Sequence, residues 1–535
     1  MYGDIDTAEE LGYVERGLKA RHIQFIAIGG TIGTGLFLGI GRALTQAGPL
    51  SLFLGYLFTG IAVYGMVQSL GEMATWLPIP GAIPQFCARY VDGALGFAVG
   101  WNSWYSYSLT VAAEVSAASV VIQYWEGIRH INVALWICLI LIGIVCLNIS
   151  TVSVYGEAEF WFASIKIITI VGLILMAFII DLGGGPKHDR LGFRYWNDPG
   201  AMKAFVANGA KGRFLGFFST LINATFAYGC IEIVAVAGGE VKNPRKNIPK
   251  AIGKVFWRIL IFYVIGSLAI GVLVPYNEKR LISAIKNNEP GGAASPWVIA
   301  IHRAGIPALP SIINACIITS AISSGNAFLF GGSRHLFALA QNGQAPRIFL
   351  TCSKTGTPYY CIAATATVAL LSLLSCSKGS AQVFVWLQNI ISISSLLIWT
   401  SVLVAYLKFY YALRAQGIAR STLPYRSKGQ PYVAWAALCY FAIIILFNGF
   451  WTFPSKTKSL NLTDFVTAYI GLPIYACLYV GWKLLKRTRT IRSGEVDLRT
   501  GKAAIDARQY QDDMMDKEKS RRPRTRWNKF WSWLV

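Results

Sequence analysis

Long apolar segments recur along this chain, and each has the length that an α-helix needs to cross a bilayer. About 20 apolar residues span the ~30 Å hydrocarbon core of a membrane. Charged residues make up 14% of the 535 positions, whereas an average soluble chain carries roughly 25%. The pattern predicts an all-α integral membrane protein with twelve transmembrane helices, at residues 22–45, 50–76, 95–122, 132–149, 159–180, 215–238, 255–275, 309–333, 359–376, 382–406, 432–450 and 462–482.

The Lys and Arg residues predict the orientation of these helices. If the N-terminus lies in the cytoplasm, most of the 49 basic residues fall on the cytoplasmic side, as the positive-inside rule requires. We therefore expect a multi-pass protein with both termini in the cytoplasm. The same asymmetry accounts for much of the net charge of +23, so that charge does not indicate a nucleic-acid partner.

A glycine-rich stretch interrupts the first apolar segment. Residues 29–35 read GGTIGTG, and each glycine inside a helix costs about 1 kcal/mol relative to alanine. In a bilayer, unwound backbone is tolerated only where it is buried in protein or lines a cavity. A half-helix that begins near Gly33 would aim free N–H groups at an anion such as a carboxylate. The alternative is a small-residue contact between two helices.

A second glycine break lies in the sixth segment, where residues 226–232 read FAYGCIE. Breaks five spans apart are expected of a 5+5 inverted repeat with one broken helix in each half, here helices 1 and 6, and this pairing favours a binding site over simple packing. The predicted parts of the chain are an N-terminal tail at 1–21, a twelve-helix domain at 22–483 and a basic C-terminal tail at 484–535. Within the helical domain, the repeats are expected at about 22–180 and 215–406, and helices 11 and 12 at 432–482.

Three ionisable residues lie within predicted spans: Glu114, Lys166 and Glu232. A central Lys or Asp costs about 2.5–3.5 kcal/mol on insertion scales, so such residues are expected to have partners or to line a path. Lys166 is a candidate for proton coupling, because a buried lysine can gain and lose a proton near neutral pH. A structural ion pair, or a lysine that snorkels to the interface, is the alternative. Glu114 is a second coupling candidate, although a structural, hydrogen-bonded role is favoured for both glutamates.

The sequence does not indicate an enzyme, a metal centre or a cofactor. Its five His residues show no metal-binding spacing, and no Ser/His/Asp set can be assembled from them. Its ten cysteines are scattered and lie mostly in apolar segments, as expected of small buried side chains.

Two polar segments have predicted roles outside the spans. Residues 71–81 contain Pro78, Pro80 and Gly81, which are expected to stop a helix and form a hinge. The charged residues from 484 onwards are expected to lack fixed structure.

Several long motifs, in a fixed order, carry a resemblance to a known family. They are 29–37 (GGTIGTGLF), 113–125 (AEVSAASVVIQYW), 155–166 (YGEAEFWFASIK), 243–250 (NPRKNIPK) and 343–346 (GQAP). The chain resembles, over about residues 15–485, the fungal amino-acid permeases of the amino acid–polyamine–organocation superfamily. The resemblance implies a leucine-transporter-type fold and proton-coupled uptake of amino acids at the plasma membrane.

The resemblance also implies a set of substrate-binding residues: Thr31, Gly33, Thr34, Gly35, Phe226, Tyr228, Gly229, Cys230 and Glu232. Main-chain N–H groups of the first break would hold the substrate carboxylate, and carbonyls of both breaks would hold its amine. Phe226 and Tyr228 would shape the side-chain pocket, and Glu232 would support the unwound segment. Lys166 matches a lysine proposed as the proton site in related bacterial members. Cys230 stands where the family usually has Gly, which alters the expected pocket.

A secondary transporter is the function that these features favour, with an amino acid, protons and the lipid bilayer as its partners. The uncharged residues of the expected pocket favour a neutral amino-acid side chain. An amino-acid receptor on the same fold is the alternative, but sensor members of the family have long N-terminal extensions that are not seen here. A passive channel is disfavoured by the paired breaks and by the lack of a charged ring.

Overall fold

The computed structural model describes residues 30–79, 81–128, 130–229, 231–232, 244–286, 295–354, 356–378, 380–453, 462–503, 505–507, 510 and 514. Within these residues every regular element is a helix, which confirms the predicted all-α class. The long helices are α4 (Pro49–Trp76), α6 (Gly93–Ile122), α8 (Val152–Asp181), α11 (Pro244–Leu273), α14 (Leu309–Gln341) and α17 (Ser380–Ala415). Shorter helices are α3 (Ile40–Ala47), α5 (Ala82–Tyr90), α7 (Val133–Ile149), α9 (Gly209–Ala227), α12 (Lys279–Lys286), α13 (Pro296–Ala304), α15 (Tyr359–Ala369), α18 (Tyr432–Phe447), α19 (Leu462–Tyr469) and α20 (Gly471–Lys486).

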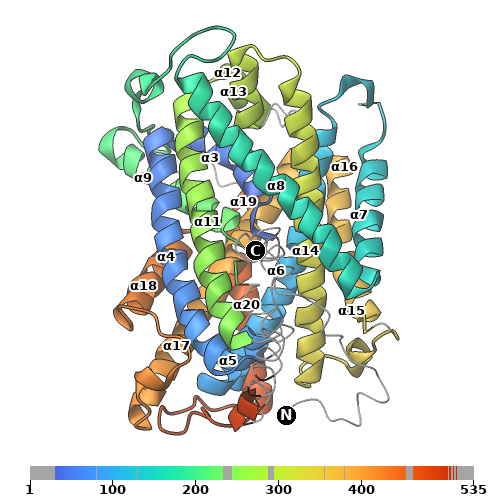
Figure 1. Ribbon diagram of the computed structural model, residues 1–535, viewed down its shortest axis with the longest axis vertical. Coiled ribbons are helices and arrows are strands. Elements are labelled where there is room, and N and C mark those ends of the chain that lie inside the picture. Colours follow the sequence, from blue (N-terminus) through green and yellow to red (C-terminus); the bar gives the residue numbers. More distant parts are fainter. Residues whose placement is uncertain are drawn as a thin grey trace.

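The helices stand side by side in one bundle, with α12 and α13 at one end and α5 at the other (Figure 1). Seven helices in the described part of the chain are long and apolar enough to cross a membrane, and the bent pair α19–α20 raises that number to eight. Helix α7 and residues 260–273 of α11 are apolar but shorter. Each of the twelve predicted segments contains helix where it is described, whereas the count of twelve crossings stays a prediction.

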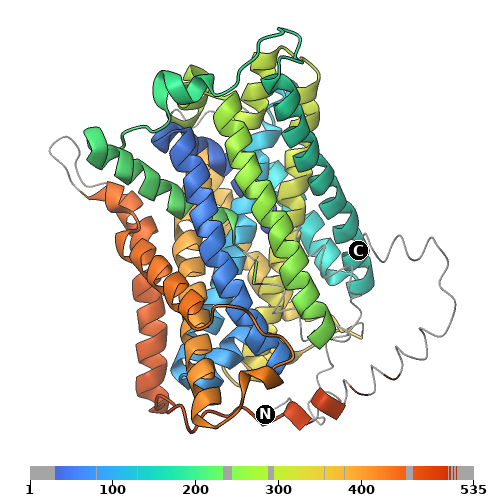
Figure 2. The ribbon, with the colours of Figure 1, turned by 60° about the vertical axis from the view of Figure 1, so that its left-hand side comes forward.

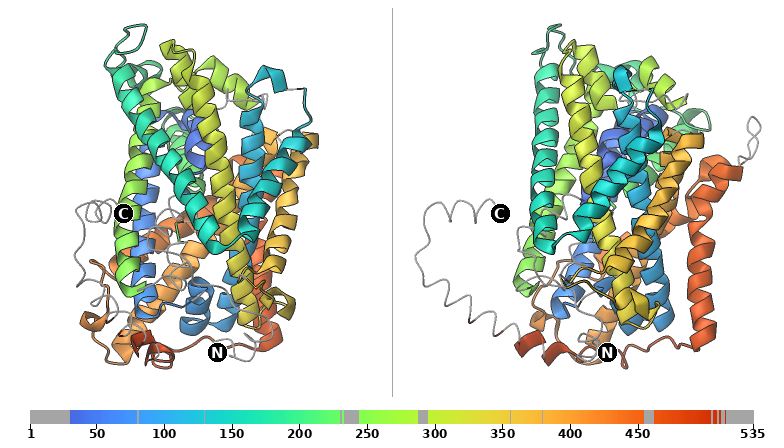
Figure 3. Two further views of the ribbon diagram at one scale, coloured as in Figure 1. Left: turned by 45° about the vertical axis from the view of Figure 1, so that its right-hand side comes forward. Right: turned by 90° about the vertical axis from the view of Figure 1, so that its right-hand side faces the viewer.

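Helix α6 is the innermost of the long helices. Its most apolar 18-residue window is 94% buried, and α14, α17 and α20 pack against it. Glycines allow this close approach, because a Cβ atom at Gly96 would lie 2.6 Å from the carbonyl oxygen of Pro84, and one at Gly100 would lie 2.5 Å from Leu339. Helices α7 and α8 cover the outer side of α14 (Figure 3), and α20 stands at the edge of the bundle (Figure 2).

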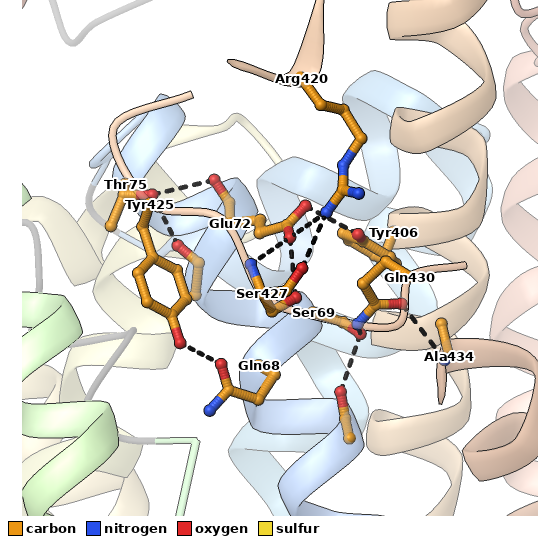
Figure 4. A network of polar contacts seen from close by, with 12 residues as sticks. Gln68, Ser69, Glu72, Thr75, Tyr406, Arg420, Tyr425, Ser427, Gln430 and Ala434 are labelled. Carbon is orange, nitrogen blue, oxygen red and sulfur yellow. Dashed lines mark hydrogen bonds and ion pairs between the residues drawn. The ribbon is translucent and has the colours of Figure 1, made fainter. Parts of the chain in front are cut away.

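A buried carboxylate ties three elements together near α5. Glu72 of α4 is fully buried, and one of its oxygens accepts hydrogen bonds from the Arg420 guanidinium at 2.6 Å and from both the main-chain N–H and the hydroxyl of Ser427 at 2.7 Å (Figure 4). The other oxygen accepts a bond from the Tyr406 hydroxyl of α17 at 2.7 Å. Two further side-chain pairs join the α17–α18 loop to α4, namely Tyr425–Gln68 and Gln430–Ser69. This network fixes the loop against the end of α4.

The predicted stop after α4 is present, but the prediction for the C-terminal tail is partly wrong. Helix α4 ends at Trp76 and α5 begins at Ala82, as the prolines between them require. Residues 488–503 and 505–507, which we call the C-terminal strap, pack along the α5 end of the bundle instead of lacking structure (Figure 3, right). The Trp76 indole donates a hydrogen bond to the carbonyl of Leu498 at 3.0 Å, and the Leu498 side chain is only 1% exposed.

Ion pairs hold the strap at two more places. Asp497 pairs with Arg89 of α5 at 3.0 Å, and Asp506 pairs with Arg245, near the start of α11, at 2.6 Å. Partial burial by itself raises the pKa of Asp506, but hydrogen bonds from Arg245 and Lys502 outweigh it and hold that pKa below its ordinary value. The contribution of this carboxylate to strap docking is therefore present above about pH 4 and lost as the pH falls through the lowered value. The average composition of the tail did not predict that the strap docks, because its apolar contacts come from a few residues within a charged sequence.

Leu498→Asp is expected to release the strap, because it would place a carboxylate in a buried apolar position. Limited trypsin digestion of the purified protein should then cleave after Arg499 and Lys502 at least tenfold faster than in the wild type. Glu495→Ala, an exposed position in the same segment, is the control and should leave the cleavage rate unchanged. Equal rates for Leu498→Asp and the wild type would contradict the docked strap.

Candidate functional site

The first glycine break interrupts a helix in the middle of the bundle. The chain is helical at Gly30 and Thr31, opens at Ile32 and Gly33, and continues as the π-helical turn η1 (Gly35–Gly39) into α3. Opening the helix frees backbone carbonyls, which must find other partners when they are buried. Two of these carbonyls lie against hydroxyl groups of α14: Ser320 donates to the Ile32 carbonyl at 3.1 Å, and the Ser324 hydroxyl oxygen lies 3.3 Å from the Gly30 carbonyl oxygen.

The second break lies beside the first. Helix α9 ends at Ala227, and the Gly229 N–H turns back to the Phe226 carbonyl at 3.1 Å. The hydroxyl of Tyr263, from α11, lies between the two breaks, at 2.6 Å from the Thr31 carbonyl oxygen and 2.8 Å from that of Ala227. One side chain thus joins the first break to the end of α9.

Gly33 and Gly35 lie so close to neighbouring segments that there is no room for a side chain at either position. A Cβ atom at Gly33 would lie 2.4 Å from a carboxylate oxygen of Glu114 and 2.8 Å from the Ser324 hydroxyl. At Gly35 it would lie 3.0 Å from the Cα atom of Ala227, which is the backbone of the second break. These glycines therefore serve close packing around the site as well as helix opening.

A cavity lies between the two breaks and is bounded by α6, α14 and α17. Its lining residues are Gly30, Thr31, Gly33, Gly35, Ser106, Tyr107, Thr110, Glu114, Phe226, Ala227, Gly229, Glu232, Phe328, Ile391 and Ser395. The volume open to the centre of a water molecule is about 20 Å³, which is room for little more than one ordered water. Among the described residues the cavity is therefore too small for an amino acid, and its walls must move apart before such a ligand can enter.

The predicted binding residues gather around this cavity in different ways. The residues that line it are Thr31, Gly33, Gly35, Phe226, Gly229 and Glu232. Thr34 is buried beside it, and its N–H points to the Glu114 carboxylate at 3.4 Å. Tyr228 faces away from it, because its hydroxyl donates to the Tyr56 carbonyl at 3.1 Å and its ring packs on Tyr263. Cys230 lies outside the described residues.

Glu232 is held by neighbouring aromatic side chains. The Trp399 indole donates to one carboxylate oxygen at 3.1 Å, and the Tyr107 hydroxyl lies 3.5 Å from the other. The carboxylate is 3% exposed, and these donors compensate part of the cost of its burial. The supporting role of Glu232 at the second break stays a prediction.

Lys166 is buried with two carboxylates. Its side chain is 1% exposed, and its ammonium interacts electrostatically with Glu114 of α6 and with Glu159 of α8. Glu114 accepts a hydrogen bond from Ser324 at 3.1 Å. Glu159 is fully buried and accepts bonds from Ser323 at 2.6 Å and from the Asn326 amide at 3.1 Å. We call Glu114, Lys166 and Glu159 the charged cluster.

Glu159 and most of the residues that line the cavity were not among the site residues predicted from the sequence. Glu159 was placed at the very start of a predicted span, although its spacing of seven residues from Lys166 puts both on one helix face. On α6, the wall residues Ser106, Thr110 and Glu114 follow at intervals of four, which is the spacing of one helix face. That polar face within an apolar segment was the available signal.

The fold defines a class of protein, a multi-span helical membrane protein, and a small cavity lies where the open turns at Gly33 and Gly229 meet. Residues 22–492 match the model of the family described as amino acid permease. The chain belongs to this amino acid permease family, and its relatives place it among the fungal members.

Three relatives show the range of the fungal members to which the chain is similar. It is 42% identical to a proline-specific permease of Emericella nidulans, with 100% of this chain and 96% of the relative covered. It is 41% identical to a dicarboxylic amino acid permease of Saccharomyces cerevisiae, with 97% and 85% covered. It is 39% identical to a lysine-specific permease of the same yeast, with 99% and 85% covered. These names describe three different substrate classes.

Proposed function

We propose that the protein is a secondary active transporter that takes up amino acids across the plasma membrane by proton symport and alternating access. The observation that carries the proposal is the small cavity between the two breaks, whose lining includes Thr31, Gly33 and Gly35 of the first break and Phe226 and Gly229 of the second. Membership of the amino acid permease family supports the transport of amino acids. The small volume of the cavity supports alternating access, because its walls must move apart to admit an amino acid, as they do in a carrier that opens its site to one side at a time.

The proposed architecture has twelve spans, arranged as a 5+5 inverted repeat with both termini cytoplasmic. The two breaks support it, since each half of such a repeat contributes one broken helix and the two meet at the ligand. Their shared contact with Tyr263 supports the same arrangement. The segments at 22–180 and 215–406 are the proposed repeats, with helices 11 and 12 at 432–482 outside them.

A zwitterion would bind by its two charged ends. The substrate carboxylate would lie against the N–H groups of Gly33, Thr34 and Gly35, where a helix begins and its dipole favours an anion. The amine would lie against the carbonyls near Thr31, Phe226 and Gly229. The Phe226 side chain lines the same cavity and would contact the substrate side chain.

The position of Glu114 supports coupling to protons. Its carboxylate accepts the Thr34 N–H, which is a donor that the substrate carboxylate would use. Two carboxylates at one site disfavour each other's ionised form, so one of them tends to hold a proton. The substrate would therefore bind best when the charged cluster has taken up a proton.

A neutral amino-acid side chain is the proposed preference. Phe226, Phe328 and Ile391 give the cavity an apolar wall, whereas Glu114 and Glu232 would repel an acidic side chain. The relatives include dicarboxylic and lysine permeases, so family membership alone does not select the substrate. Competition by each of the twenty amino acids against uptake of one labelled neutral amino acid tests this preference.

Lys166→Ala is expected to abolish proton-driven accumulation while the protein still inserts in the membrane. The charged cluster would lose its cation, and two uncompensated carboxylates would then face each other. The measurement is uptake of labelled amino acid into proteoliposomes under an imposed pH gradient. Ser164→Ala on the same helix is the control, because its hydroxyl bonds to its own helix at Phe160.

The same assay tests the proposed function with the wild-type protein. A proton symporter concentrates the amino acid when the outside is acidic and stops when the gradient is collapsed. A receptor would bind the amino acid without accumulation, and a channel would equilibrate it without concentrating it. Either of those results would overturn the proposal.

A further inference from the structure

The charged cluster contains two carboxylates and one ammonium group, all of them buried. Glu159 and Lys166 lie on one face of α8, two turns apart, and Glu114 faces them from α6. If all three groups are ionised, the cluster carries one net negative charge. One proton therefore makes it neutral, and the position of that proton decides how the protein couples to pH.

The two carboxylates differ in their hydrogen-bond donors. Glu159 accepts a short bond from Ser323 and a second from Asn326, whose own amide oxygen is held by Asn148 of α7 at 2.8 Å. These donors are side chains of packed helices. Hydrogen bonds to the ionised form favour that form, and short charge-assisted bonds are the strong ones. Glu159 is thus built to stay an anion.

Glu114 has weaker and less permanent donors. Its bond from Ser324 is 3.1 Å long, and its bonds from the Thr34 N–H are 3.4 Å long. The Thr34 N–H belongs to the open turn of the first break, where an arriving substrate carboxylate would compete for it. Glu114 therefore loses a donor at the moment when a second negative charge approaches.

Two other titratable side chains contact Tyr107, which lines the cavity. Glu232 is held by Trp399 and Tyr107, and the His335 ring of α14 packs against the Tyr107 ring with centroids 4.9 Å apart. Neither is bonded to Glu114 or Glu159 among the contacts of the described residues. Their charge would add to the field at Glu114, but neither shares its donors.

We propose that Glu159 is the fixed counter-ion that keeps Lys166 charged, and that the transported proton binds Glu114 and not Lys166. The inference rests on the proton symport proposed above. Glu159 then acts as a positioning residue: it takes no part in substrate binding, but it holds the ammonium group so that Glu114 is left to gain and lose the proton. The proposal assigns different roles to the two coupling candidates found in the sequence.

Lys166→Arg separates a fixed cation from a proton carrier. Arginine stays protonated in proteins, so the variant keeps the charge but cannot give up a proton. We expect Lys166→Arg to retain accumulation driven by a pH gradient in proteoliposomes. For one proton per substrate, a gradient of one pH unit supports accumulation of up to about tenfold. Loss of accumulation with retained exchange of labelled for unlabelled amino acid would overturn the proposal.

Glu159→Gln tests the fixed anion. Without Glu159, the ammonium group pairs with Glu114 alone, and the pair is already neutral without a proton. We expect the pH of half-maximal uptake to move towards acid by about one unit or more, because the like charge of Glu159 no longer disfavours the ionised form of Glu114. Accumulation under the pH gradient should disappear at neutral pH, whereas exchange at equal pH should remain.

Two companion variants show whether the effect comes from the charge of Glu159. Glu159→Asp keeps the anion and should restore most of the wild-type pH profile. Glu157→Gln removes a carboxylate two residues earlier, which points to a different face of α8, and should leave the profile unchanged. If Glu159→Gln keeps the wild-type pH profile and accumulation, the proposed role of Glu159 is overturned. This test does not depend on whether Lys166→Arg inserts in the membrane.

The wild type separates this proposal from the one on which it rests. If wild-type protein does not accumulate amino acid under a pH gradient, proton symport itself is wrong, whatever the variants do. If the wild type accumulates and Glu114→Gln still responds to the gradient, symport stands and the assignment of the proton to Glu114 is overturned.

Discussion

Gly33→Val is expected to weaken amino-acid binding by roughly 5- to 150-fold and to reduce uptake accordingly. A Cβ atom at this position would lie 2.4 Å from the Glu114 carboxylate and 2.8 Å from the Ser324 hydroxyl, and valine adds two further methyl groups. Overpacking of a tight interior costs about 1–3 kcal/mol, which converts to that range of affinity. The displaced Glu114 would also lose its place at the Thr34 N–H.

The measurement for Gly33→Val is equilibrium binding of a labelled amino acid to purified protein, with thermal unfolding recorded in parallel. Gly143→Val on α7 is the matched control, because a Cβ atom there meets nothing within 4 Å. The control should keep wild-type affinity. Wild-type affinity in Gly33→Val as well would show that the first break does not form the carboxylate site.

Glu72→Ala is expected to lower the thermal stability of the whole bundle more than substitution of an exposed charge. Four hydrogen bonds to its carboxylate would be lost, and the donors of Tyr406 and Ser427 would stay buried without that acceptor. Removing one partner of a buried ion pair costs about 3–5 kcal/mol. The lower part of this range applies, because the Arg420 side chain is 24% exposed and keeps contact with water.

Thermal unfolding in one detergent measures the effect of Glu72→Ala. The double variant Glu72→Ala/Arg420→Ala should recover part of the loss, since it removes the unpaired cation as well. Asp189→Ala, which breaks an exposed pair with Arg194, is the control and should leave the unfolding temperature unchanged. An equal and negligible effect of Glu72→Ala would show that the network does not hold the loop against α4.

The two breaks were predictable because their cause is local. Clustered glycines weaken a helix wherever they occur, and a bilayer allows an open turn only in a protected place. The structure places the open turns at Gly33 and Gly229, where the glycine pattern predicted them. The all-helical class followed from composition in the same way.

The cavity wall was not predictable from the same signals. Phe328 and Ile391 come from helices far along the chain, and in the sequence they look like ordinary apolar residues of a span. Tyr228 shows the opposite case. Its place in the sequence beside Phe226 and Gly229 suggests that it lines the pocket, but its hydroxyl donates to the Tyr56 carbonyl and it is not among the lining residues. Which side of a helix faces a cavity depends on the neighbouring helix.

The sequence by itself determined the class, the family likeness and the places where helices open, because these depend on the composition and glycine content of short segments. Only the tertiary structure decided which charges share a site. Glu159 meets Ser323 across 164 positions of chain, and the C-terminal strap docks on α4 through Leu498. Such contacts depend on how helices pack, since a buried charge is stable only where distant segments bring it a partner.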